Sequence, residues 1–299
     1  MQGGKTETWR EFNLNLSLYA SFSFPLFNKI KNNIYVKTYG YKSGLKLKKK
    51  KETIEFSGCT EKEALLLSGV WFNPEEKAKK LTRRNKEIFN ELYQIFSGLG
   101  IAIDPWDLKA LFYSVFLSRN TSFHVNTVRW MKKITKLTNE ENITKLDLKL
   151  VGLSYQLVQL SEIKGKVEEI LSNISMRKVG NEKVFNDLKA KLLSLPYVGP
   201  KTIHAFGIFC FGITNLAPVD RHLLKFMVLT GIYNENTVMP KKKFCMCFSC
   251  SNCPIKHVCL SGIIVDNFGS LACWIQTASY LYGVLYLNKG EDPIGLLKR

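Results

Sequence analysis

The sequence predicts an α+β fold, in which a small antiparallel sheet domain precedes a larger and mostly helical region. Short runs of alternating apolar and polar residues, typical of half-buried strands, extend from about residue 12 to residue 57. After Asn85, apolar residues recur at helical spacing as far as the C-terminus. We therefore expect an N-terminal β-containing domain over residues 1–85 and a helical region over residues 86–299.

The expected strands lie in residues 12–18, 33–39 and 53–57, where every second side chain is apolar. A lysine-rich run at 46–51 lies between the second and third of these segments, and we interpret it as a solvated basic turn, with contact to phosphates as the alternative.

Helical signals begin with residues 86–96, which have apolar residues near a spacing of 3.6 and end at a Ser-Gly pair suited to a helix C-terminus. We expect the next helix to open at Asp104, with Pro105 in its first position, because an aspartate at the N-cap followed by proline is a common helix start.

Composition limits the class of protein. In a chain of 299 residues, 45% hydrophobic and 12% aromatic residues are enough for a core, which argues against a disordered or fibrous protein. Lys and Arg number 43 against 25 Asp and Glu, so the formal net charge is +18. Such an excess favours a polyanionic partner, with nucleic acid first and an anionic membrane surface second.

Membrane insertion and secretion are not expected. The first residues lack the apolar segment of a secretory signal, and the longest uncharged run, 271–288, contains polar residues and glycine. We interpret that run as a buried helix and expect an intracellular protein.

The most informative segment is 192–205, with the sequence LLSLPYVGPKTIHA. It predicts a helix that ends at Leu-Pro, a tight turn through Val198 and Gly199, and a second helix from Pro200. In such a helix-hairpin-helix, Gly199 lets backbone amides approach a DNA phosphate, and the positive end of the second helix adds to the attraction.

Lys201 and Asp220 add chemistry to this hairpin. Lys201 is expected in the first turn of the second helix, where repulsion from the helix dipole would help to lower its pKa, as an amine nucleophile requires. Asp220 is expected to cap the helix over residues 221–229 and also to place a carboxylate near Lys201, where it could stabilise positive charge on a sugar.

These motifs resemble the helix-hairpin-helix superfamily of DNA base-excision glycosylases. The resemblance implies that Lys201 attacks C1′ of a flipped nucleotide with help from Asp220, which makes the protein a glycosylase with AP lyase activity on double-stranded DNA. The chain departs from the family pattern at Tyr197, where the family usually has glycine.

Three further stretches resemble the 8-oxoguanine DNA glycosylase branch: DPWDL at 104–108 followed by SRN at 118–120, GLSY at 152–155, and the segment 269–280. The resemblance implies that Asn120 fills the space left by the flipped base, that Tyr155 wedges between bases, and that Gln276 and Tyr280 read and stack on the damaged base. Residues 20–24 resemble the strand segment that supplies a carbonyl to that base. Where this branch has two arginines that recognise the opposite cytosine, the chain has Gln156 and Val125, which predicts a relaxed preference for the opposite base.

A cysteine-rich loop over residues 240–262 indicates a metal site, because five cysteines lie within 15 residues and thiolates ligate both zinc and iron–sulfur clusters. Its second half resembles the iron–sulfur loop of endonuclease III. That resemblance implies a structural [4Fe–4S] cluster, with zinc as the alternative, held by Cys245, Cys250, Cys253 and Cys259, and Cys247 is the other candidate for the first ligand. Cys59, Cys210 and Cys273 are expected to be buried thiols.

Together these features predict a monomeric bifunctional glycosylase for 8-oxoguanine that has no membrane partner. Two alternatives stay open from the sequence: an endonuclease III-like glycosylase for oxidised pyrimidines, and a helix-hairpin-helix protein that binds DNA without catalysis.

Overall fold

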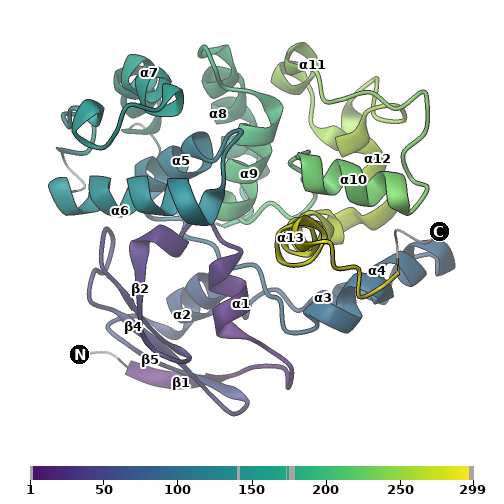
Figure 1. Ribbon diagram of the computed structural model, residues 1–299, viewed down its shortest axis with the longest axis horizontal. Helices are drawn as coiled ribbons and strands as arrows, with labels where there is room; N and C mark the ends of the chain where they lie inside the picture. The colour runs from purple at the N-terminus through teal and green to yellow at the C-terminus, as the bar shows by residue number, and fades with distance from the viewer. Residues whose placement is uncertain (1–2, 140–141, 173, 175–178, 296–299) are drawn as a thin grey trace.

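The fold was analysed in a computed structural model, which describes residues 3–139, 142–172, 174 and 179–295. A five-stranded antiparallel sheet forms the N-terminal part, and helices form the rest (Figure 1). The predicted fold class is thus confirmed, whereas the domain boundary at residue 85 stays a prediction. The buried apolar side chains form one cluster that extends from the sheet into the helices.

The strands follow the order β1-β5-β4-β3-β2 across the sheet, and every neighbouring pair is antiparallel. Helix α2 packs against strands β1 and β5. The strand bounds are β1 Gly3–Glu7, β2 Phe27–Lys31, β3 Ile34–Lys37, β4 Lys46–Lys50 and β5 Thr53–Ser57.

The helices surround a central group that carries the candidate site, in which α9 packs on α5 and α8, and α10 packs on α13. Figure 1 shows these helices above the sheet, with α10, α11 and α12 on the side away from α6 and α7. The bounds are α1 Leu14–Tyr19, α2 Glu61–Ser68, α3 Pro74–Ala78, α4 Arg83–Phe96, α5 Leu108–Leu117, α6 Val128–Leu137, α7 Tyr155–Ser172, α8 Glu182–Ser194, α9 Pro200–Phe211, α10 Arg221–Leu229, α11 Lys242–Cys247, α12 Leu260–Phe268 and α13 Ala272–Leu285.

Two sequence-based expectations about the sheet are wrong. Residues 12–18 were expected to form a strand, but helix α1 starts there, because the Asn13 side chain accepts the amide of Leu16 and the buried Leu14 and Leu18 lie one helical turn apart. The lysine-rich run at 46–51 is not a turn but strand β4, in which Leu47 is buried while Lys48 pairs with Glu55 of β5.

Other expectations are confirmed. Strands β3 and β5 lie within the segments 33–39 and 53–57, and helix α4 ends at Phe96, as its pattern predicts. Helix α13 occupies the uncharged run and is mostly buried. Within the described part of the chain, no helix has the length and apolar character that a membrane crossing requires.

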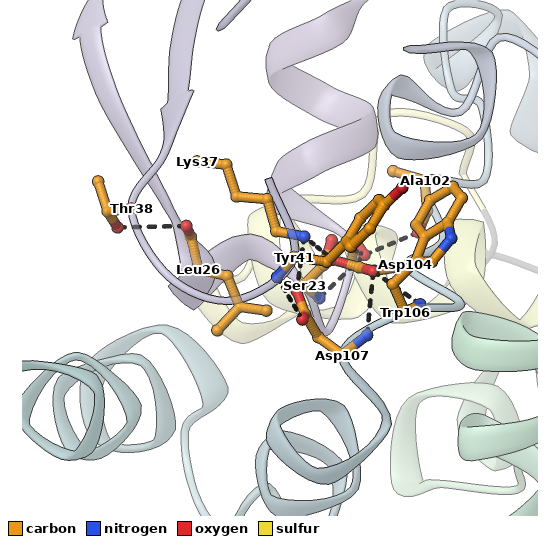
Figure 2. Close-up of polar contacts among 10 residues, drawn as sticks. Ser23, Leu26, Lys37, Thr38, Tyr41, Ala102, Asp104, Trp106 and Asp107 are labelled. Atoms are coloured by element: carbon orange, nitrogen blue, oxygen red, sulfur yellow. Dashed lines mark hydrogen bonds and ion pairs between the residues drawn. The ribbon is translucent and has the colours of Figure 1, made fainter. Parts of the chain in front are cut away.

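A buried ion cluster joins the sheet to the segment before α5. The Lys37 ammonium, at the end of β3, lies 2.7 Å from a carboxylate oxygen of Asp104 and 2.5 Å from one of Asp107, and all three side chains are inaccessible to solvent (Figure 2). The second oxygen of Asp107 accepts the Tyr41 amide at 2.8 Å. Burial, and next the neighbouring Asp107, raise the pKa of Asp104 to about 7.

The expected helix start at Asp104 is wrong, because α5 begins only at Leu108. Asp104 instead turns the chain, since its Oδ1 accepts the amides of Trp106 and Asp107 at 3.1 and 3.3 Å. Its other oxygen binds Lys37, so this carboxylate serves the contact with the sheet rather than a helix end.

Candidate active site

A cavity of about 620 Å³ opens between α9, α10, α13 and the segment that follows α5. Five of the residues singled out from the sequence line this cavity: Asn120, Lys201, Asp220, Gln276 and Tyr280. They come from four separate segments, so the fold brings together side chains that lie up to 160 residues apart in the chain. Their arrangement suits a ligand with both an apolar face and polar groups.

Lys201 lies in the first turn of α9, which starts at Pro200 after a hairpin turn that joins it to α8. Burial lowers the pKa of Lys201, the charge of Asp220 opposes this shift, and the charges of Arg221 and Arg119 lower the pKa further. Together these effects lower the pKa of Lys201, which raises the fraction of neutral amine near neutral pH. Repulsion from the helix dipole, the cause expected from the sequence, stays a prediction.

Asp220 caps α10, as the sequence predicts. Its Oδ1 accepts the amides of His222 and Leu223 at 3.0 and 2.8 Å, and its Oδ2 lies 3.3 Å from Nε2 of Gln276. The helix end therefore fixes one oxygen, and the other faces the cavity side chains. A carboxylate held in this way needs little reorganisation to interact with a cation that develops in the cavity.

Gln276 and Tyr280 project from one face of α13, four residues apart, and both reach the cavity. The Tyr280 ring meets the His222 ring edge-on, with centroids 5.5 Å apart. Glycine is required beneath that histidine, since a Cβ at Gly283 would lie 2.0 Å from His222 Nδ1. His222 follows Asp220 and Arg221 in the chain and also lines the cavity, a position that the sequence did not predict.

The apolar wall of the cavity includes three phenylalanines, Phe22, Phe123 and Phe209, and Phe22 meets each of the other two edge-on at 5.1 Å. Sequence reasoning missed Phe123 and Phe209, because phenylalanine in a buried helix signals only core. The strand expected over residues 20–24 is absent: the segment forms a turn that leads into the short helix Phe24–Leu26, and Ala20 and Phe22 line the cavity from it.

A shallower groove of about 270 Å³ lies beside the cavity over the hairpin turn, and Asn120 and Lys201 line both. Asn120 has a positive φ of 48°, and Tyr197 one of 63°. Gly199 also lines the groove, with an extended φ of −120° that any residue adopts and with open space where a Cβ would be. No contact within the described chain requires glycine there, and the phosphate-approach role expected of Gly199 stays a prediction.

Tyr155 is not part of the cavity. It is the first residue of α7 and 50% exposed, and the neighbouring Leu153 is 86% exposed. Gln156 is buried and donates its amide to the Arg119 carbonyl at 3.0 Å, whereas Val125 is 63% exposed. The wedge role expected of Tyr155 stays a prediction.

The cysteines of the 240–262 loop converge only in part. Cys245, Cys250, Cys253 and Cys259 line one small cavity, whereas Cys247 is exposed. Even so, the described residues contain no group of three or more His, Cys, Asp or Glu in an arrangement that could hold a metal ion.

Burial raises the pKa of the Cys245 thiol to about 11 and that of Cys250 to about 12. The three isolated cysteines, Cys59, Cys210 and Cys273, are buried, as expected.

Comparison with solved structures identifies the architecture. The Clostridium acetobutylicum 8-oxoguanine glycosylase/lyase, bound to DNA with cytosine opposite 8-oxoguanine, superposes with a TM-score of 0.66 at 14% identity, over 95% of this chain and 98% of that one. MBOgg1, in complex with a low-affinity DNA ligand, gives 0.61 at 15% identity, over 97% of this chain and all of that one.

A 3-methyladenine DNA-glycosylase from Archaeoglobus fulgidus gives a TM-score of 0.62 at 16% identity, with 95% of this chain and 99% of that one covered. The chain therefore has the fold that these solved glycosylase structures share. At this level of identity the glycosylase structures share the fold with this chain, and the chemistry must be argued from its own residues. The sequence matches no protein-family model and no curated protein.

Proposed function

We propose that the protein is a bifunctional DNA glycosylase with AP lyase activity that removes 8-oxoguanine from double-stranded DNA. One observation carries the proposal: Lys201, whose pKa is lowered, and Asp220, which caps α10, line the same cavity in a glycosylase fold. A DNA-binding scaffold has no need of either feature. An amine nucleophile needs its neutral form and a route to the substrate, and an open cavity provides the route.

In the proposed reaction, the damaged nucleotide is flipped into the cavity, where Tyr280 stacks on the base and Gln276 binds its edge. The nitrogen of Lys201 forms a bond to C1′, and the electron pair of the glycosidic bond leaves with the base. The departing base is then an anion, and a proton released from the Lys201 nitrogen neutralises it. Asp220 stabilises the positive character at C1′.

Strand cleavage follows from the same adduct. Opening of the sugar ring gives a protonated imine between Lys201 and C1′, and loss of a proton from C2′ then expels the 3′-phosphate by β-elimination. Asn120 and Tyr155 are proposed to hold the distorted duplex, and Gly199 to bring hairpin amides to a phosphate.

Double-stranded DNA as the partner agrees with the net charge of +18, because a duplex is a dense polyanion. The groove over the hairpin, beside the cavity, is lined by two basic residues, Arg119 and Lys201. We propose that the protein acts as a monomer in the intracellular compartment that holds DNA.

A structural metal group in the cysteine loop is also proposed, as a [4Fe–4S] cluster with zinc as the alternative. Four thiols line one cavity, and thiols are the donor type that such a group takes. The buried Lys189 lies near them and donates to the Phe248 carbonyl at 2.8 Å. Cys245, Cys250, Cys253 and Cys259 would hold the group, which would cross-link the loop. Brown protein with about four irons per chain is expected by metal analysis, whereas colourless protein with zinc would favour the alternative and metal-free protein would refute both.

Borohydride trapping tests the enzymatic proposal, because the reagent reduces the imine to a stable amine. Wild-type protein should form a covalent adduct with DNA that contains 8-oxoguanine, and K201Q should form none. Adducts with an oxidised pyrimidine alone would favour the endonuclease III-like alternative, to which the cysteine cavity also points. Binding without any adduct would support the non-catalytic alternative.

A further inference from the structure

Arg119 has an unusual set of contacts for a residue in a turn. It lies between Ser118 and Asn120, directly after α5, and its guanidinium donates to three acceptors. Nε donates to the Phe116 carbonyl at 2.9 Å, Nη1 to the Tyr197 carbonyl at 2.6 Å, and Nη2 to Gln159 Oε1 at 2.7 Å. The guanidinium also lies 3.7 Å from the centre of the Phe116 ring.

These contacts join three segments that are far apart in sequence. The acceptor Tyr197 belongs to the hairpin turn, 78 residues away, and Gln159 belongs to the first part of α7, 40 residues away. The Arg119 carbonyl also accepts the amide of Gln156, which follows Tyr155 in α7. One side chain and its own backbone therefore hold the turn of Asn120, the hairpin turn and the start of α7.

Tyr197 gives the hairpin turn a particular need for support. Its φ of 63° is left-handed, a conformation that a residue with a Cβ adopts only at a cost in free energy. Arg119 fixes its carbonyl, and the tyrosine hydroxyl donates to Glu162 of α7 at 2.8 Å. These two hydrogen bonds hold a turn that glycine would form without assistance.

We propose that Arg119 is a positioning residue that fixes the three DNA-contacting turns relative to one another and to Lys201. An effect of Arg119 on excision rests on the proposed function. The ordering of the hairpin turn by Arg119 is a property of the free protein and does not depend on that function. The charge of Arg119 also lowers the pKa of Lys201, so the same side chain acts on the amine that it helps to place.

The geometry of the guanidinium distinguishes arginine from lysine here. A planar fork can donate in three directions at once, whereas a lysine ammonium at the end of a flexible stem cannot reach the same three acceptors. R119K therefore keeps the charge but loses the bridge. R119M removes both.

Hydrogen exchange on the free protein tests the structural part. In R119M we expect the amides of residues 197–199 to exchange faster than in wild type, with R119K between the two. R83M is the matched control, because the Arg83 side chain is 95% exposed on α4 and pairs with Glu87 of the same helix. Equal exchange at the hairpin in R119M and wild type would overturn the proposal.

Excision kinetics test the catalytic part. R119M should lower kcat on the order of 10- to 100-fold, since small misplacement of reacting groups has effects of that size. R119K should recover only part of this loss, and R83M should match wild type. Y197G in the R119M background should restore part of the rate, because glycine forms the left-handed turn without support.

Each outcome has a separate meaning. Full activity in R119K, or no recovery in R119M/Y197G, would contradict the bridging role. If R119M fails to fold, R119K still carries the comparison by exchange and kinetics. Wild-type protein that excises nothing would refute the proposed function, whereas the exchange result would still decide whether Arg119 orders the hairpin.

Discussion

Replacing Lys37 with methionine should destabilise the protein strongly, because the lysine is the cation in a cluster that also contains two carboxylates. All three side chains are inaccessible to solvent, and the ammonium lies 2.7 and 2.5 Å from Asp104 and Asp107. Removing one partner of a buried pair leaves an uncompensated charge, which lowers the free energy of unfolding by about 3–5 kcal/mol. A domain is usually stable by about 5–15 kcal/mol, so the loss is a large share of the total.

The pH dependence of this effect follows from Asp104. Its pKa is raised from 3.8 to about 7 by burial and by Asp107, so between about pH 4 and 7 the native state binds a proton that the unfolded state has lost. Stability from this group is therefore present at low pH and is lost as the pH rises through 7. In K37M the opposing effect of Lys37 is gone, the pKa of Asp104 rises further, and the deficit is largest in alkali and smallest in acid.

Urea unfolding at pH 5 and pH 8 checks both statements. D104N is the matched variant, because it leaves Lys37 and Asp107 as a pair without excess charge, and we expect it to change stability by less than about 1.5 kcal/mol. If K37M matched wild type at pH 8, or if D104N were as unstable as K37M, the charge balance inferred for the cluster would be wrong.

Three further predictions concern the site. The rate of trapping should rise with pH through a midpoint below 10.5, the ordinary pKa of lysine, because Lys201 must lose its proton; a midpoint at or above that value would contradict its lowered pKa. G283A should lower the free energy of unfolding by about 1–3 kcal/mol in thermal melts, since the added Cβ overlaps His222; an unchanged melting temperature would contradict this contact. Excision opposite each of the four bases should vary by less than about tenfold, because Gln156 is buried and Val125 has no side-chain donor, and strong selection for cytosine would refute that.

Local signals in the sequence were sufficient for the parts of the fold that depend on neighbours in the chain. The Pro-Tyr-Val-Gly-Pro run predicts the hairpin because proline fixes φ and cannot continue a helix, and glycine permits backbone conformations that tight turns use. Asp220 predicts the start of α10 because an N-cap acts on amides two and three residues away. Both signals are local in the sequence, and both features carry the proposed chemistry.

The errors arise where two local patterns are compatible with one sequence. Leucines at 14, 16 and 18 fit strand alternation, and those at 14 and 18 fit a helical turn equally well. The helix forms because Asn13 caps it and the two leucines share a buried face. In β4 the lysines obscured the strand, since its outer face is solvated and one buried leucine is a weak signal.

Contacts between distant segments could not be predicted from one sequence. The two distant acceptors of Arg119, the fit of His222 over Gly283, and the phenylalanine wall depend on how helices pack. An arginine in a polar turn gives no sign that its partners lie 40 and 78 residues away. Such contacts decide the details of the site, and they become visible only in three dimensions.

Asp220 caps α10 and has a proposed catalytic role, and the two roles can be separated. Asparagine is as good an N-cap as aspartate, because its side-chain oxygen accepts the same amides, but it carries no charge. D220N should therefore keep the stability of α10 while it loses excision, whereas D220A should also lose about 1 kcal/mol of unfolding free energy with the cap. Chemical denaturation and single-turnover excision of both variants check this. Wild-type excision by D220N would show that the carboxylate only caps the helix, and the stabilisation of C1′ would then have to come from elsewhere in the cavity.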